Sequence, residues 1–138
     1  QRDATPYLYQ TTATNWLENE TLGEEVFGPL GLLVLADNLD QMRAVAQALQ
    51  GQLTCTLHMD KADTDIAKRL MPILERKAGR ILANGFPTGV EVSDTMVHGG
   101  PYPASTNFGA TSVGTLSIRR FLRPVCFQDI PAELIPEC

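Results

Sequence analysis

The pattern of apolar and polar positions is most regular between residues 30 and 84. Leu30–Ala36 is a short and almost continuously apolar run (LGLLVLA), which is typical of a strand covered on both faces in a parallel sheet. A helix is predicted next, because Asn38 and Gln41 have the spacing of a capping box and Gly51 stands where a helix end favours a left-handed residue. The apolar face of this helix consists of Leu39, Met42, Val45, Ala46 and Leu49.

A second strand and a second helix follow. Across 52–58 apolar side chains alternate with polar ones, so that Leu53, Cys55 and Leu57 share one face of a strand. The next helix begins among three aspartates, whose negative charge suits a helix N-terminus, and Pro72 within its pattern predicts a kink or a break. Its buried face is expected to consist of Ile66, Ala67, Leu70, Ile73 and Leu74.

Gly79 is expected to end this helix, and Arg80–Asn84 (RILAN) is predicted to be a third strand. A strand–helix–strand–helix–strand order implies parallel pairing with right-handed crossovers. The sequence therefore predicts an α/β fold: one domain over residues 1–138, with a parallel, three-layer βαβαβ core at 30–84.

The flanking segments are less regular. Tyr7–Thr12 has the pattern of a strand, and a short helix is expected around Trp16–Glu20. Residues 85–111 form a long loop rich in Gly, Pro, Ser and Thr, and loops of that length in a compact domain are usually functional or disordered. Ser112–Arg120 has a helical pattern, and Phe121–Gln128 that of a strand, which its internal proline places at a sheet edge.

Composition and charge narrow the class of protein. The chain has 138 residues, of which 43% are hydrophobic and 20% charged, as in ordinary globular domains. No apolar run approaches the ~20 residues that span a bilayer, so no membrane segment is expected. The net charge of -5 repels phosphate backbones and argues against nucleic acid as a partner.

Three widely spaced cysteines, without a visible secretion signal, favour a reducing, cytoplasmic location. The chain opens with Gln1 rather than Met, which indicates either a trimmed start or a piece of a longer protein.

Two segments have the residue types for chemistry. Glu24–Pro29 (EEVFGP) precedes the first core strand; a carboxylate there can accept two hydrogen bonds from a sugar diol, and an aromatic ring two residues later can lie against a flat heterocycle. A charged turn followed by a buried Phe is the simpler interpretation. In His98–Ser105 (HGGPYPAS), two glycines permit close approach to a ligand. The histidine there is either an acid–base group or a residue that fills space in the loop.

Other fingerprints are missing. No G-x-G-x-x-G follows a strand, and no G-x-x-x-x-G-K-[ST] is present. Cys55 and His58 lie on opposite faces of the predicted strand, and the three aspartates of the second helix lack the glycine and glutamate of a calcium loop. No metal site is predicted. Cys55, which alternates inward, is interpreted as a core cysteine.

These segments, in their order along the chain, resemble the NAD(P)-dependent aldehyde dehydrogenases. EEVFGP is similar to the cofactor-contact motif of that family, and it stands just before a strand–helix–strand–helix–strand run. AGRILANGFPTGVEV, followed by HGGPYPAS, resembles one branch, the α-ketoglutarate semialdehyde (2,5-dioxopentanoate) dehydrogenases. The resemblance extends from about Tyr7 to Pro131, and the order of the three segments makes it specific.

The resemblance implies roles for individual residues. Glu25 matches the glutamate that binds the nicotinamide ribose of NAD or NADP, and Phe27 matches the aromatic residue that packs near the nicotinamide ring. Phe86, Val97 and His98 match the loop that walls the aldehyde tunnel.

Two further matches concern structure and assembly. Asn84 matches an asparagine with a structural role at the end of the strand before that loop. Residues 121–128 resemble the strand that these enzymes use in subunit association, which implies a homo-oligomer.

The resemblance also implies what this chain lacks. In the family, the catalytic cysteine, the general base and the dinucleotide-binding domain precede EEVFGP, so this chain corresponds to the C-terminal part of the catalytic domain and supplies no catalytic residue. The parent enzyme would oxidise a small-molecule aldehyde, such as an oxo-acid semialdehyde, to the acid, with the remainder of the parent chain as partner. A carboxylate on that substrate requires a basic residue, for which Arg80, Arg119, Arg120 and Arg123 are available.

Two other interpretations stay open. A stand-alone, non-catalytic α/β module that binds a ligand or a partner would explain the missing nucleophile. A small hydrolase that uses Cys55 or His98 is the other.

Overall fold

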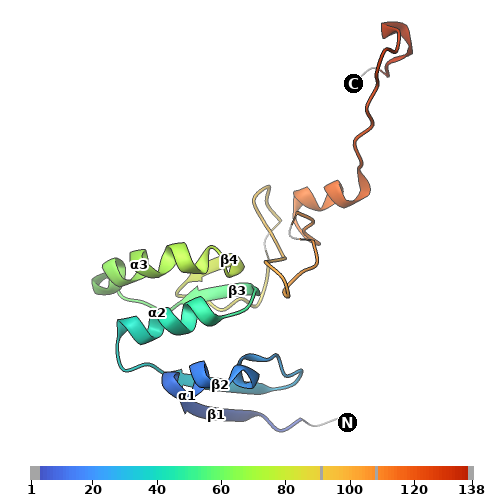
Figure 1. The fold of residues 1–138 in the computed structure, drawn as a ribbon. Helices are drawn as coiled ribbons and strands as arrows, with labels where there is room; N and C mark the ends of the chain where they lie inside the picture. The colour runs from blue at the N-terminus through green and yellow to red at the C-terminus, as the bar shows by residue number, and fades with distance from the viewer. Residues whose placement is uncertain (1–3, 91, 108, 137–138) are drawn as a thin grey trace.

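The computed structural model describes residues 4–90, 92–107 and 109–136, and its strands and helices alternate along the chain (Figure 1). The strands are β1 (Tyr7–Thr12), β2 (Leu30–Leu35), β3 (Gln52–Leu57) and β4 (Ala78–Ala83). The α-helices are α1 (Ala13–Glu18), α2 (Leu39–Ala48) and α3 (Thr64–Leu74). Short 3-10 helices occupy η1 (Glu20–Gly23), η2 (Lys61–Asp63), η3 (Thr115–Phe121) and η4 (Ala132–Leu134). Parallel strands in alternation with helices confirm the α/β class.

The strands form two parallel pairs instead of one continuous sheet. β1 lies beside β2, with Tyr7 opposite Leu30. β3 lies beside β4, with Cys55 opposite Ile81. Within the described parts of the chain no ladder joins β2 to β3. The order of elements predicted for 30–84 is therefore confirmed, but the predicted pairing of its first two strands is wrong, because the neighbour of β2 is the N-terminal strand β1.

The core lies where α2 and α3 pack on one face of the β3–β4 pair. Its buried centre consists of Ala46 from α2 and Leu70 and Leu74 from α3. The partly buried Cys55, Leu57, Ile73 and Ile81 pack against this centre. Because Cys55 and Ile81 are opposite each other in the ladder, both helices cover the same face of the pair. The other face of the pair carries Thr54 and Arg80, which line a cavity together with residues 87–90 of the loop that follows β4.

Side-chain capping determines where α2 begins. Asn38 accepts a hydrogen bond from the backbone N–H of Gln41 at 3.0 Å, which satisfies one of the amide groups left free at a helix start. The side chain of Gln41 accepts in return from the N–H of Asp37 at 2.8 Å, one residue earlier than in a capping box. The predicted cap is therefore confirmed, with a shifted second partner.

α3 continues through Pro72 to Leu74 without a break. A proline at this position removes one amide donor near the end of the helix, and the helix stops two residues later in any case. A capping box between Asp60 and Asp63 precedes the helix, with the N–H of Asp60 donating to the Asp63 carboxylate at 2.9 Å.

Gly51 and Gly79 allow close packing and do not end helices. α2 ends at Ala48 and α3 at Leu74, and among the described glycines only those at 28 and 114 have a positive φ. A Cβ on Gly51 would collide with the carbonyl of Pro101, and one on Gly79 with the carbonyl of Gly99. The 98–103 segment thus lies directly against the starts of β3 and β4.

Beyond η3 the chain leaves the body as an extended tail (Figure 1). The helix predicted for 112–120 is the shorter 3-10 helix η3. The strand predicted for 121–128 does not form in the single chain, because Phe121 ends η3 and the next residues have no ladder partner among the described strands. Its large apolar side chains are between 49% and 82% exposed: Phe121, Leu122, Val125 and Phe127.

No helix in 4–90, 92–107 or 109–136 combines the length and the apolarity needed to cross a bilayer.

The Gly79→Ala substitution tests the close crossing at β4. The added methyl group would overlap the Gly99 carbonyl, so we expect the free energy of unfolding to fall by about 1–3 kcal/mol, as for other overpacked sites. Chemical denaturation measures this loss. Gly85→Ala is the matched control, because the nearest atom to its new Cβ would be 3.8 Å away. Equal stability of the two variants would contradict the crossing.

Candidate functional site

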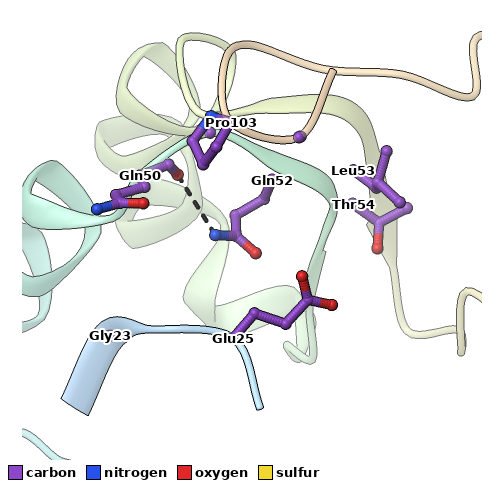
Figure 2. A pocket seen from close by; sticks show the side chains of 9 residues that line it. Gly23, Glu25, Gln50, Gln52, Leu53, Thr54 and Pro103 are labelled. Atoms are coloured by element: carbon purple, nitrogen blue, oxygen red, sulfur yellow. Dashed lines mark hydrogen bonds between the residues drawn. The ribbon is translucent and has the colours of Figure 1, made fainter. Parts of the chain in front are cut away.

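One cavity lies between the segment before β2 and the start of β3. It has a volume of about 320 Å³ and is lined by Gly23, Glu25, Gln50–Thr54, Pro103 and Ala104. Figure 2 shows the Glu25 side chain extending toward Gln52 and Thr54 across this space. The Gln52 side chain is held by a long hydrogen bond of 3.5 Å from its amide nitrogen to the carbonyl of Gln50. A carboxylate acceptor therefore faces an amide and a hydroxyl across a space large enough for a small polar ligand.

Phe27 does not join Glu25 in this cavity. Its side chain is 93% exposed, so the buried position of the simpler interpretation is wrong. Gly28, which follows it, has a φ of 156° and leads the chain directly into β2. The structure therefore brings only one of the two predicted cofactor residues to a described cavity.

His98 lies in a second cavity, on the face of β3–β4 away from the helices. Its backbone N–H donates to the hydroxyl of Thr111 at 2.9 Å, and that hydroxyl donates to the carbonyl of Val113 at 2.9 Å. Thr111 is only 5% exposed. The buried Thr111 side chain thus holds the backbone amide of His98, which lies 13 residues earlier in the loop.

The second of the two glycines after His98 is held by Ser105. The Ser105 hydroxyl donates to the carbonyl of Gly100 at 2.6 Å and accepts from its N–H at 3.3 Å. Sequence reasoning missed both Thr111 and Ser105, because isolated hydroxyl residues in a loop have no periodic pattern. Only Ser105 had a positional signal, since it follows the glycine pair at short range, whereas Thr111 lies 13 residues after His98.

The other two predicted pocket residues lie apart from His98. The ring of Phe86 packs at a tilt against that of His58, with 5.4 Å between the centroids, and Phe86 is 76% exposed. Val97 is partly buried beside Gly99. The loop therefore does not gather Phe86, Val97 and His98 around one cavity.

Asn84 joins the carboxyl ends of β3 and β4. Its side-chain oxygen accepts from the N–H of Met59 at 2.8 Å, and its side-chain nitrogen donates to the carbonyl of Met59 at 2.9 Å. The residue has a φ of 52°, a left-handed conformation that asparagine tolerates better than most residues. These two hydrogen bonds to the backbone of Met59 agree with the structural role expected for Asn84.

Cys55 is a core residue, as predicted. Its side chain packs against the buried centre formed by α2 and α3, and burial raises the pKa of its thiol. A raised pKa reduces the thiolate fraction at neutral pH, which is the opposite of what a catalytic cysteine requires.

Among the residues that the structure describes, no three His, Cys, Asp or Glu side chains gather in a way that could hold a metal ion.

Comparisons with known proteins agree with the resemblance. No protein-family model matches the chain. The chain is 56% identical over 130 residues to "Alpha-ketoglutaric semialdehyde dehydrogenase 2" of Azospirillum brasilense, a match that covers 94% of this chain and 25% of that protein. It is 49% identical over 135 residues to "Alpha-ketoglutaric semialdehyde dehydrogenase" of Acinetobacter baylyi, covering 97% of this chain and 26% of that protein.

In sequence the chain is similar to aldehyde dehydrogenases, and its own fold is of the α/β class. Its similarity is to proteins named α-ketoglutaric semialdehyde dehydrogenases, which confirms the narrower resemblance of the AGRILANGFPTGVEV and HGGPYPAS segments. The chain spans about a quarter of the length of these curated relatives.

Thiol alkylation tests the position of Cys55. In a Cys138→Ser background we expect iodoacetamide to modify the exposed Cys126 at least roughly tenfold faster than Cys55 at neutral pH, because the raised pKa of Cys55 leaves less thiolate. Peptide mass spectrometry over a time course gives both rates. Faster modification of Cys55 would revive the hydrolase interpretation.

Proposed function

We propose that this chain is the C-terminal portion of an NAD(P)-dependent aldehyde dehydrogenase that oxidises an oxo-acid semialdehyde, such as α-ketoglutarate semialdehyde, to the acid. The proposal is carried by one juxtaposition: in a chain similar to enzymes of that name, the Glu25 carboxylate extends into a polar cavity. The overall reaction consumes the aldehyde, water and NAD(P)⁺ and yields the acid, NAD(P)H and a proton.

The residues around Glu25 suit one part of the cofactor. An ionised carboxylate can accept hydrogen bonds from two neighbouring ribose hydroxyls, and Gln52 and Thr54 add polar groups on the other side of the cavity. At about 320 Å³ the cavity suits a nucleoside and not a whole dinucleotide. When bound, the cofactor supplies the hydride acceptor. We assign Phe27 to the nicotinamide ring by resemblance alone.

The aldehyde site is assigned to the loop at 85–111. Phe86, Val97 and His98 are assigned to one wall of it by resemblance alone, because the described chain does not gather them around one cavity. The Thr111 and Ser105 hydrogen bonds support a defined backbone position at 98–100. The nucleophilic cysteine and the general base are expected from the remainder of the parent chain.

The open sheet supports the remainder of the parent chain as partner. β2 and β3 have no ladder between them, yet α2 joins the two pairs by packing against both α1 and α3. Strand edges offer unpaired N–H and C=O groups, and large apolar side chains on these strands are more than a third exposed: Leu30, Leu33, Leu35 and Leu53. A further parallel segment between the pairs would satisfy both edges and cover this apolar surface.

The tail supports assembly of the parent enzyme into a homo-oligomer. Its apolar side chains between 121 and 135 are exposed in the single chain, and an extended segment can add a strand to the sheet edge of another copy. We also propose a cytoplasmic location, on the composition argument that three widely spaced cysteines suit a reducing compartment.

One test of the proposed function concerns the isolated 138 residues. We expect no reduction of NAD⁺ or NADP⁺ with α-ketoglutarate semialdehyde, because Cys55 lies in the core and its thiol pKa is raised. Absorbance of the reduced nicotinamide measures turnover, and the full-length parent enzyme is the positive control. Turnover by the isolated chain would refute the proposal that the nucleophilic cysteine and the general base come from the remainder of the parent chain.

Another test of the proposed function concerns Glu25 in the full-length parent enzyme. Glu25→Gln removes the charge that strengthens two hydrogen bonds, so we expect the KM for NAD(P)⁺ to rise roughly 10- to 100-fold while the KM for the aldehyde changes little. Glu24→Gln is the matched control, since Glu24 is adjacent but does not line the cavity shared with Gln52. The same kinetics for both variants would remove Glu25 from the cofactor site.

A further inference from the structure

A cavity of about 280 Å³ lies on the face of β3–β4 that the helices leave uncovered. Its walls come from three places: Leu53, Thr54 and Arg80 on the strands, residues 87–90 in the following loop, and His98. Thr54 and Arg80 are opposite each other in the β3–β4 ladder, so both side chains belong to this face. The walls are largely apolar, and one permanent cation lies among them.

Arg80 is held under the loop by its own hydrogen bond. Its Nη1 donates to the carbonyl of Gly89 at 2.7 Å and approaches the sulfur of Met96 at 4.0 Å. Both contacts use the same nitrogen. The Nε–H on the other side of the guanidinium is buried and has no acceptor among the described residues. A buried donor without an acceptor is costly, so an acceptor is missing at this position.

The charge of Arg80 is also uncompensated within the described chain. The ion pairs there join Asp40 to Arg43 and Asp65 to Lys68, both on exposed helix surfaces. A partly buried guanidinium has lost some of its hydration, and a carboxylate restores the balance best because two oxygens match two parallel N–H groups. Arg119, Arg120 and Arg123, the other basic residues considered for a carboxylate, are exposed on η3 and the tail.

We propose that this cavity is a carboxylate-binding pocket in which Arg80 holds the carboxylate of the oxo-acid substrate. The inference rests on the proposed function and gives it a specificity-determining residue. The carboxylate takes the guanidinium edge that Gly89 leaves free, and Thr54 and His98 line the same space. Because the Nε atom has no exposed surface here, the walls must rearrange locally when the carboxylate reaches it.

The alternative is that Arg80 acts only on structure, by holding the loop or by pairing with a carboxylate elsewhere in the parent enzyme. Substrate charge separates the two roles. A structural arginine affects every aldehyde alike, whereas a carboxylate-binding arginine affects only aldehydes that carry a carboxylate.

The test uses the full-length parent enzyme and two aldehydes, α-ketoglutarate semialdehyde and the uncharged pentanal. For Arg80→Met we expect kcat/KM for the charged aldehyde to fall roughly 10- to 100-fold, mainly through KM, with the value for pentanal within about twofold of wild type. Arg80→Lys should retain part of the discrimination, since it keeps the charge but not the planar fork. Arg69→Met, an exposed substitution on α3, is the control for loss of a positive charge and should behave as wild type.

Equal losses for both aldehydes would overturn the proposal and leave Arg80 a structural role. If Arg80→Met does not fold, the test uses Arg80→Lys and compares its loss of kcat/KM for the charged aldehyde with its loss for pentanal. Binding of glutarate gives a second readout. Glutarate should raise the thermal midpoint of wild type more than that of Arg80→Lys, and an equal shift would overturn the proposal. A wild-type enzyme that oxidises neither aldehyde while glutarate still binds through Arg80 would refute the proposed function and not the pocket.

Discussion

The close crossing of the 98–103 segment over the starts of β3 and β4 is the constraint on which the rest of this structure depends. Backbone lies against backbone at Gly51 and at Gly79, where a Cβ would collide with a carbonyl of the crossing segment. The crossing anchors the far end of the long loop, while Asn84 anchors its near end to the backbone of Met59. Between these anchors the loop covers the strand face that carries Arg80, and it places His98 beside that face.

Two parts of the molecule differ in how well their apolar side chains are covered. They are covered in the small core where α2 and α3 pack on β3 and β4. They are exposed between the two strand pairs and along the tail beyond η3. Both of these exposed regions present apolar side chains and unpaired backbone groups, which proteins normally cover. Under the function proposed above, the remainder of the parent chain would pack against these surfaces.

The two cavities share Leu53 and Thr54 in their walls but differ in their charged residue. One presents the carboxylate of Glu25 and suits hydroxyl donors, whereas the other presents the guanidinium of Arg80 and suits an anion. An enzyme that oxidises a charged aldehyde with a nucleotide cofactor needs both kinds of recognition. Under the proposed function, Glu25 and Arg80 would serve cofactor and substrate recognition separately, although Leu53 and Thr54 line both cavities.

The sequence by itself determined the order and class of the elements, the cap of α2, the core position of Cys55 and the resemblance of the motifs, because these depend on local periodicity and short-range spacing. It could not determine that β2 pairs with β1, since every parallel strand offers the same backbone edge. Only the tertiary structure decided that Gly51 and Gly79 serve close packing, that Phe27 faces solvent and that Arg80 and His98 line one cavity. These contacts join residues distant in sequence, and no local pattern carries that information.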